Sequence, residues 1–314
     1  MAEPANTRVG VVDLGTNTTR LLVAELRSGE LHELDKRTTI TRLGQGVDAT
    51  GRLADEAMDR VRDALAVYRE VIDRLEVGEV IAVATSAMRD ASNGPEFRDE
   101  LHESFGIDAR TISGDEEARL TFLGATADRA QHERTQTVVI DIGGGSTEYV
   151  TGTAAEGLGF HVSTQMGSVR HTERFLASDP PAHRELNALA TDIRAVIGGC
   201  LPARTREATV QGIAVAGTAT SLAAIDQELD PYDSAKVHGY QVSLAAAERI
   251  LAMLAALPLG ERRQVPGLHP DRAPTIVAGV AILVESIRAF GLDEIEVSEA
   301  DILHGAALDA ASTD

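Results

Sequence analysis

With 314 residues, 43% of them hydrophobic, the chain is long enough for about two globular domains. A formal net charge of −20 argues against a nucleic-acid-binding surface, which needs clustered cations. The longest apolar stretch, residues 276–284, is too short to cross a bilayer, and the polar segment 1–8 does not resemble a secretion signal. A single cysteine, Cys200, in an apolar stretch predicts buried packing and a reducing, cytoplasmic environment.

The first half of the chain is predicted to be rich in strands. Residues 9–23 contain two β-prone runs around a tight loop, and residues 30–40 add a third strand of alternating polarity. Apolar residues at helical spacing predict a long amphipathic helix over 53–75. The remaining expected elements are a buried strand at 80–84, a helix at 96–105, a short strand at 109–112 and a helix at 115–127.

The second half repeats this order from residue 138. A new pair of strands surrounds a glycine-rich loop, and a third strand follows at 159–164. Two helices are then predicted at 169–176 and 183–196, and a buried strand at 212–216 runs into a further helix. The rest is predicted to be largely helical, at 244–257, 274–290 and 301–311, with a strand at 294–297. We expect the join between the halves at residues 127–136.

Two short segments, about 128 positions apart, share one pattern. Each is an apolar run that ends in an aspartate, Asp13 or Asp141, followed by a loop of glycine and hydroxyl residues and a second β-prone run. The small loop residues leave backbone N–H groups uncovered beside a carboxylate, which suits phosphate and a hydrated cation. The repeat predicts two related domains that face each other across a cleft.

We expect Asp13 and Asp141 to hold one hydrated Mg²⁺ that bridges phosphate oxygens. The alternative is that each aspartate only starts a turn, as aspartates often do. The duplicated context favours the metal site. The phosphate cradle is then formed by the two loops, which consist of Gly15, Thr16, Asn17 and Thr18 in the first copy and of Gly143, Gly144, Gly145 and Ser146 in the second.

Residues 113–119, Ser-Gly-Asp-Glu-Glu-Ala-Arg, open a predicted helix. Ser113 and Glu116 have the spacing of a capping box, and acids in a first helical turn complement the helix dipole, so a structural role is one interpretation. The segment also lies near the predicted domain join, where a glutamate could orient a water for attack on phosphorus. The residues alone leave both interpretations open.

Two further segments end buried strands and begin helices, a place where ligands gather in open α/β sheets. Arg89 is a candidate phosphate clamp, with a solvent-facing role as the alternative, and Gly217 and Thr218 form a third candidate phosphate or nucleotide contact. The nine histidines lack zinc-ligand spacing, and neither a nucleophile elbow nor a Walker A loop occurs. Phosphate chemistry with a hard cation remains.

Five segments together resemble the exopolyphosphatase and guanosine pentaphosphate phosphohydrolase (Ppx/GppA) family over nearly the whole chain. They are residues 13–18, 84–89, 112–119, 141–148 and 217–222. The resemblance implies an α/β, actin-like (ribonuclease H-like) duplicated βββαβαβα fold with an active site between two lobes. A C-terminal helix that returns to the first lobe is also implied, which gives an N-terminal lobe of 1–128 with 301–314 and a C-terminal lobe of 129–300. A homodimer is a further expectation.

By the same resemblance, Glu117 is the catalytic base, Glu148 assists it, Asp13 and Asp141 hold the metal, and Arg89 binds phosphate. Mg²⁺ is the implied ion, while Mn²⁺ and activation by K⁺ are left open. The expected reaction is hydrolysis of the terminal phosphoanhydride of inorganic polyphosphate, which releases orthophosphate. Because the chain ends before the helical phosphohydrolase-like domain of longer family members, short polyphosphate chains or a nucleotide pentaphosphate are the expected substrates.

Other functions stay open. The same residues could hydrolyse guanosine pentaphosphate, and a non-catalytic sensor of polyphosphate or an alarmone would need only the binding loops. A sugar or acetate kinase, or an ATP-driven chaperone, would bind ATP at residues 217–221. Three departures from the family pattern bear on these alternatives: threonine at 16 and 18 where serine is common, fewer glycines in 217–221, and no arginine and glutamate before Gly305.

Overall fold

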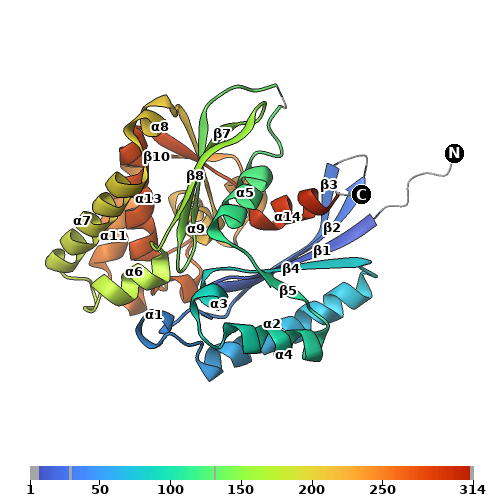
Figure 1. The fold of residues 1–314 in the computed structure, drawn as a ribbon. Coiled ribbons are helices and arrows are strands. Elements are labelled where there is room, and N and C mark those ends of the chain that lie inside the picture. Colours follow the sequence, from blue (N-terminus) through green and yellow to red (C-terminus); the bar gives the residue numbers. More distant parts are fainter. Residues whose placement is uncertain (1–6, 28–29, 131, 312–314) are drawn as a thin grey trace. The chain divides into compact units, whose positions relative to one another are not determined.

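The computed structural model of the chain describes residues 7–27, 30–130 and 132–311 (Figure 1). The chain divides into two compact units, one of residues 1–124 with 302–314 and one of residues 125–301. Each unit is built on its own mixed β-sheet with helices packed against it.

The sheet of the first unit has the strand order β3-β2-β1-β4-β5. The first three strands in the chain pair antiparallel, whereas β4 runs parallel to β1 and β5 parallel to β4. The strands are β1 (Thr7–Leu14), β2 (Thr18–Arg27), β3 (Glu30–Ile40), β4 (Glu79–Ala84) and β5 (Ala109–Thr111). This confirms the three consecutive strands predicted at the start of the chain.

Helices cover both faces of this sheet because alternate strand residues point to opposite sides. Val12 and Leu14 of β1 belong to the core formed with α2 and α4, while Val9 and Val11 pack with α14. The helices of the unit are α1 (Val47–Thr50), α2 (Asp55–Arg74), α3 (Ser86–Asp90), α4 (Gly94–Phe105), α5 (Gly114–Ala125) and α14 (Ile302–Ala311).

The sheet of the second unit has the order β10-β11-β9-β6-β7-β8. Its strands are β6 (Thr137–Ile142), β7 (Thr147–Thr153), β8 (Gly157–Thr164), β9 (Gln211–Val215), β10 (Tyr240–Ser243) and β11 (Glu294–Val297). The series β8-β7-β6-β9-β11 repeats β3-β2-β1-β4-β5 in order and in strand direction. This duplication is that of the predicted two-lobe actin-like fold, to which the second unit adds the unpredicted β10.

Helix α13 forms the centre of the second core. It is buried almost throughout and packs against α6, α7, α9 and α11. The helices of the unit are α6 (Ser168–Phe175), α7 (His183–Cys200), α8 (Ala203–Ala208), α9 (Ala216–Asp226), α10 (Ser234–Val237), α11 (Leu244–Ala256), α12 (Leu259–Arg262) and α13 (Ile276–Phe290), with the 3₁₀ turn η1 (Pro270–Arg272). None of the described helices has the length and apolarity needed to cross a membrane.

Three local predictions were wrong. The helix expected to end at residue 196 continues through two glycines to Cys200, because buried Ile193 and Ile197 keep its apolar face packed. Cys200, which was expected to be buried, is only partly buried. Ala216, expected at the end of a strand, instead begins α9 with a φ of 64°. A non-glycine residue in this left-handed region is uncommon and marks a tight strand-to-helix turn.

Candidate active site

The first hairpin loop joins β1 to β2 in the first unit. The N–H of Gly15 donates to the carbonyl of Thr18 at 3.0 Å, and a Cβ on Gly15 would lie 2.8 Å from that oxygen, so only glycine fits. Gly44 donates its N–H to the Thr16 carbonyl at 2.8 Å, and the N–H groups of residues 41 and 42 donate to that of Asn17. In a trans peptide the C=O and N–H groups point in opposite directions. The N–H groups of Asn17 and Thr18, which share peptide planes with the carbonyls of Thr16 and Asn17, therefore face away from residues 41–44.

Asp13, at the end of β1, is paired with an arginine that the sequence analysis missed. Its carboxylate is buried and accepts hydrogen bonds from Arg20 Nε at 2.9 Å and Nη2 at 2.7 Å. Arg20 lies directly opposite Asp13 in the β1–β2 register. The hairpin register was the signal that could have revealed this pair, because a loop of this length places residues 13 and 20 side by side.

Two contacts connect the other predicted residues of the first unit. The hydroxyls of Thr16 and Ser86 lie 2.7 Å apart, which ties the hairpin loop to the start of α3. Arg89, on the same helix, donates from Nη1 to the carbonyl of Ile112 at 2.9 Å, and this nitrogen lies 3.5 Å from Glu117 Oε2. The candidate base and the candidate phosphate clamp are therefore neighbours.

The two glutamates at the start of α5 have different surroundings. The N–H of Glu116 donates to Ser113 Oγ at 3.1 Å, as expected for a helix cap, while its carboxylate pairs with Arg110 at 2.7 Å. Glu117 is buried, with 8% of its surface exposed, although both are helix-starting acids. The capping interpretation thus applies to Glu116 and does not account for the burial of Glu117.

The second hairpin loop has the same internal closure in the second unit. The N–H of Gly143 donates to the carbonyl of Ser146 at 3.0 Å. Behind the loop, the start of α6 donates to three successive carbonyls: Ser168 N to Gly143, the N–H groups of residues 169 and 170 to Gly144, and Arg170 Nε to Gly145 at 2.8 Å. Among the described residues, no protein acceptor takes the N–H of Gly144 or Gly145. The loop therefore presents backbone donors on the face away from α6.

Asp141 is placed like Asp13 but has a different neighbour. The residue opposite it in the β6–β7 register is Glu148, and both carboxylates are buried. Glu148 accepts a hydrogen bond from Ser163 Oγ of β8 at 2.7 Å. The second hairpin thus sets two acids side by side where the first sets an acid against an arginine.

Gly217 and Thr218 begin α9 at the carboxyl end of β9. A Cβ on Gly217 would lie 1.3 Å from Arg272 Nη1, so this guanidinium packs directly on the glycine. A Cβ on Gly279 of α13 would meet Thr218 Oγ1 at 2.6 Å and the Ser168 Cβ at 3.3 Å. The structure therefore brings the start of α9 next to the start of α6, which supports the glycine-rich loop.

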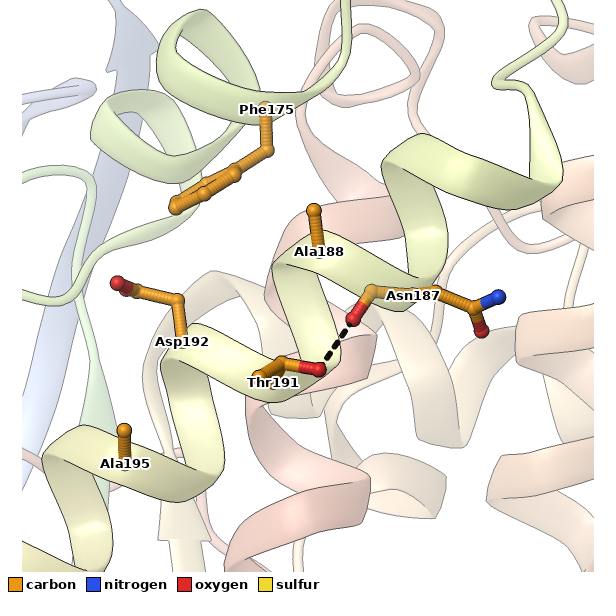
Figure 2. Close-up of a pocket in the computed structure, with 6 residues that line it drawn as sticks. All are labelled: Phe175, Asn187, Ala188, Thr191, Asp192 and Ala195. Atoms are coloured by element: carbon orange, nitrogen blue, oxygen red, sulfur yellow. Dashed lines mark hydrogen bonds between the residues drawn. The ribbon is translucent and has the colours of Figure 1, made fainter.

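A shallow groove in the second unit contains none of the predicted site residues. It has a volume of about 500 Å³ and lies between α6 and α7, where Figure 2 shows Phe175 on one side and α7 side chains on the other. Asp192, on its α7 side, lies 3.1 Å from Nε2 of buried His171. In the described part of the chain, no cluster of three or more His, Cys, Asp or Glu side chains has the arrangement of a metal site.

Comparisons with known proteins give a consistent family. A model of the Ppx/GppA phosphatase family matches residues 22–313. Exopolyphosphatase 2 of Mycobacterium tuberculosis is 39% identical to the chain, over 98% of the chain and 99% of that protein. The family model begins within β2, after the first hairpin loop, and includes the second hairpin, whereas the match to Exopolyphosphatase 2 covers nearly the whole chain.

Two solved structures are similar over nearly the whole chain. An exopolyphosphatase-like protein is 32% identical with a TM-score of 0.92, over 98% of each chain. The Ppx/GppA family member of Aquifex aeolicus is 30% identical with a TM-score of 0.81, also over 98% of each chain.

Proposed function

This chain belongs to the Ppx/GppA phosphatase family, and on that premise we propose that it is an exopolyphosphatase. It hydrolyses the terminal phosphoanhydride of inorganic polyphosphate and releases orthophosphate. The observation that carries this proposal is the 39% identity with Exopolyphosphatase 2 over nearly the full length of both proteins. Short polyphosphate chains stay the predicted substrates. The lobes 1–128 with 301–314 and 129–300 are the proposed domains.

Glu117 is the proposed catalytic base. As a buried carboxylate at the first turn of α5, it takes a proton from a water whose oxygen attacks the terminal phosphorus, and the bridging P–O bond breaks as the shortened chain leaves. Arg89 holds this carboxylate on one side. The predicted contact of Arg89 with phosphate requires the same guanidinium to reach the substrate, and it stays a prediction.

The two hairpin loops are the proposed phosphate cradles. In each loop the carbonyls are held from behind, by residues 41–44 or by the start of α6, so the neighbouring N–H groups are oriented before a ligand arrives. Such preoriented donors stabilise the negative charge of the phosphoanhydride without reorganisation. Thr16 contributes less than predicted in this proposal because its hydroxyl is already bonded to Ser86. Gly217 and Thr218 stay predicted contacts.

Phosphatases of this family generally depend on a divalent metal. The donor set of the second unit fits Mg²⁺, because Asp141 and Glu148 offer two neighbouring buried carboxylates, whose oxygens are the ligands this ion prefers. When bound there, the ion would neutralise phosphate oxygens. The predicted ligand Asp13 already accepts two hydrogen bonds from Arg20, so its share in the site stays a prediction. Mn²⁺, K⁺ activation, a cytoplasmic location and a homodimer also stay predictions.

Replacement of the base tests the reaction. Glu117→Gln should lower the turnover of short polyphosphate by about 10²- to 10⁴-fold while the protein stays folded. Glu116→Gln, one residue away at the helix cap, is the matched control and should stay within about two-fold of the parent rate. Orthophosphate release and thermal unfolding of all three proteins are measured in parallel. A Glu117→Gln protein with near-normal turnover would show that the assigned base is wrong.

The competing substrates are separated by one panel. Short polyphosphate, long polyphosphate, guanosine pentaphosphate and ATP are each given to the purified protein with and without Mg²⁺. The proposal expects metal-dependent orthophosphate release that is fastest with short polyphosphate. Faster release from guanosine pentaphosphate would favour the alternative hydrolase, and binding without release would favour a sensor.

A further inference from the structure

One charged side chain of α6 reaches the backbone of the second hairpin loop. Arg170 is half-buried, and its Nε donates to the carbonyl of Gly145 at 2.8 Å. Among the described residues, the Gly145 carbonyl accepts its hydrogen bond from this side chain. The carbonyls of Gly143 and Gly144 instead accept hydrogen bonds from backbone N–H groups at the start of the same helix. Backbone N–H groups therefore support the loop at Gly143 and Gly144, with Ser168 Oγ as a further donor to Gly143 at 3.2 Å, whereas a charged side chain supports it at Gly145.

We propose that Arg170 is a positioning residue of the phosphate loop, which holds the Gly145–Ser146 peptide plane so that its N–H faces the substrate. This inference rests on the proposed function and deepens it. The ligand class is an inorganic phosphoanhydride, whose oxygens accept hydrogen bonds from the loop. The sequence analysis gave Arg170 no role, because nothing in the spacing of residues 143–148 and 170 links them.

The chemistry of the loop explains why such a support matters. Three successive glycines have more accessible backbone conformations than any other residue type, so a loop of this composition loses much entropy when it is ordered around a ligand. A hydrogen bond from a charged donor is stronger than one from a neutral donor, and it fixes the peptide before binding. When the loop is already ordered in the free protein, its ordering adds no entropy cost to ligand binding.

The position of the guanidinium adds a second effect. The protein carries a net charge of −20, which opposes the approach of a polyanion. Arg170 places one positive charge directly on the loop that is proposed to take the phosphate. Burial lowers the pKa of this guanidinium, but an arginine stays protonated at neutral pH.

A neighbouring arginine supplies a matched control. Arg174 lies one turn along α6, carries the same charge, and stacks on the ring of Phe175 at 5.1 Å. Among the described residues, Arg174 makes no hydrogen bond to the loop like the one that Arg170 makes to Gly145. Arg170→Met removes the donor and keeps an apolar stem, Arg170→Lys keeps a charged donor, and Arg174→Met removes a charge of the same helix.

The test measures KM and kcat for tripolyphosphate together with thermal unfolding. Arg170→Met should raise KM about ten-fold, the loss expected for one charge-assisted hydrogen bond, with a midpoint of unfolding within about 2 °C of the parent. Arg170→Lys should recover most of this loss, and Arg174→Met should leave KM unchanged. An unchanged KM in Arg170→Met, or equal effects of Arg170→Met and Arg174→Met, would overturn the proposal, as would a loss confined to kcat and unfolding temperature.

Hydrogen exchange separates this inference from the proposed function. The amides of residues 169 and 170, which donate to the Gly144 carbonyl, should exchange about ten-fold faster in Arg170→Met than in the parent, and those of residues 41 and 42, which donate to the Asn17 carbonyl, should not change. If the parent protein releases no orthophosphate from tripolyphosphate, the proposed function fails, while exchange still tests the positioning role. Equal exchange in the parent and Arg170→Met would contradict that role.

Discussion

The two hairpins have the same loop closure but opposite electrostatics. Gly15 and Gly143 each donate to the carbonyl three residues later, and each loop follows a buried, strand-ending aspartate. Opposite the first aspartate stands Arg20, and opposite the second stands Glu148. Duplication has therefore preserved the backbone cradle while one cross-strand residue changed the charge beside it.

This difference suggests a division of roles between the hairpins. The positive charge of Arg20 beside Asp13 opposes the binding of a cation there, whereas two neighbouring carboxylates attract one. The groups that hold the loop carbonyls also differ between the two hairpins. Backbone amides of residues 41–44 hold the first loop, and the second relies on a helix start and the Arg170 side chain.

The largest effect should come from removing the aspartate of each hairpin in turn. Asp141→Asn should lower Mg²⁺-stimulated turnover by on the order of 10³-fold, because a metal ligand contributes several kcal/mol to charge stabilisation. The concentration of Mg²⁺ needed for half-maximal activity should rise with it. Asp13→Asn should leave that concentration within about three-fold of the parent value, since the Arg20 charge bound to Asp13 opposes a cation at that site.

Metal titrations of orthophosphate release, supported by isothermal titration calorimetry of Mg²⁺ binding, check this contrast. Glu148→Gln is the second arm and should weaken Mg²⁺ binding in the same direction as Asp141→Asn. Equal shifts for Asp13→Asn and Asp141→Asn would break the comparison and restore a metal held by both hairpins.

The next effect is on stability and should have opposite signs in the two hairpins. Arg20→Met leaves the buried Asp13 carboxylate without its cation, which should lower the free energy of unfolding by about 3 kcal/mol. Glu148→Gln removes one of two acids that face each other and keeps an acceptor for Ser163, so stability should be unchanged or higher by up to about 1 kcal/mol. Urea unfolding of the parent and both variants measures the difference.

The double variant Asp13→Asn with Arg20→Met controls for the unpaired charge. It should be more stable than Arg20→Met alone, because no buried carboxylate remains. A destabilised Glu148→Gln protein would show that the second acid pair is held by contacts stronger than its repulsion.

Much of the fold could be predicted from the sequence, because apolar periodicity and the repeated hairpin are local signals. The strand triplets, the long helix α2 and the duplicated order all follow from such signals. The strand β10 and the short helices α8, α10 and α12 did not, since four to six residues carry too little periodicity and depend on their neighbours for stability.

The site was predictable in its residue types and less so in their partners. Asp13, Asp141 and the two loops stand at the strand ends that the pattern indicated. Arg20 was missed although the hairpin register could have revealed it, and no local signal links Arg170 to a loop 25 residues earlier. Long-range side-chain contacts of this kind are set by tertiary packing and leave no spacing in the sequence.

A smaller effect should follow from adding one methyl group behind each loop. A Cβ on Gly167 would lie 2.4 Å from the backbone carbonyl oxygen of Gly144, whereas one on Gly44 would meet the Thr16 methyl at 2.2 Å. Backbone cannot rotate away, so Gly167→Ala should displace the second loop, cost about 2 kcal/mol of stability and raise KM for tripolyphosphate. Gly44→Ala requires only a new Thr16 rotamer and the loss of its bond to Ser86, which should cost about 1 kcal/mol.

Thermal unfolding and steady-state kinetics of the two alanine variants measure this contrast. Gly198→Ala, at a helical glycine whose Cβ would meet nothing within 4 Å, is the control and should be neutral or stabilising. If Gly44→Ala cost more than Gly167→Ala, the first loop would be the more rigid of the two.

The smallest predicted effect is a change of stability with pH, which should affect the start of α6 behind the second loop and not residues 41–44 behind the first. His171 follows Arg170 on α6, and burial lowers its pKa, an effect that the nearby Asp192 opposes in part. Residues 41–44 contain no histidine. The unfolded chain therefore binds a proton more readily than the folded one as the pH falls below about 6.5, so the contribution of His171 to stability is complete above that pH and is lost toward acid.

Between pH 7.5 and 5.5 the stability attributable to His171 should fall, by no more than about 1.4 kcal/mol for each pH unit below about 6.5, which is the limit for one proton. Urea unfolding of the parent and His171→Leu at both pH values isolates this share, because other groups titrate in both proteins. The protection factors of amides 169 and 170, which correct exchange for its intrinsic pH dependence, should also fall toward acid in the parent more than those of amides 41 and 42. Identical pH dependence in the parent and His171→Leu would contradict the assignment, and the helix that carries Arg170 would then support its loop equally well at both pH values.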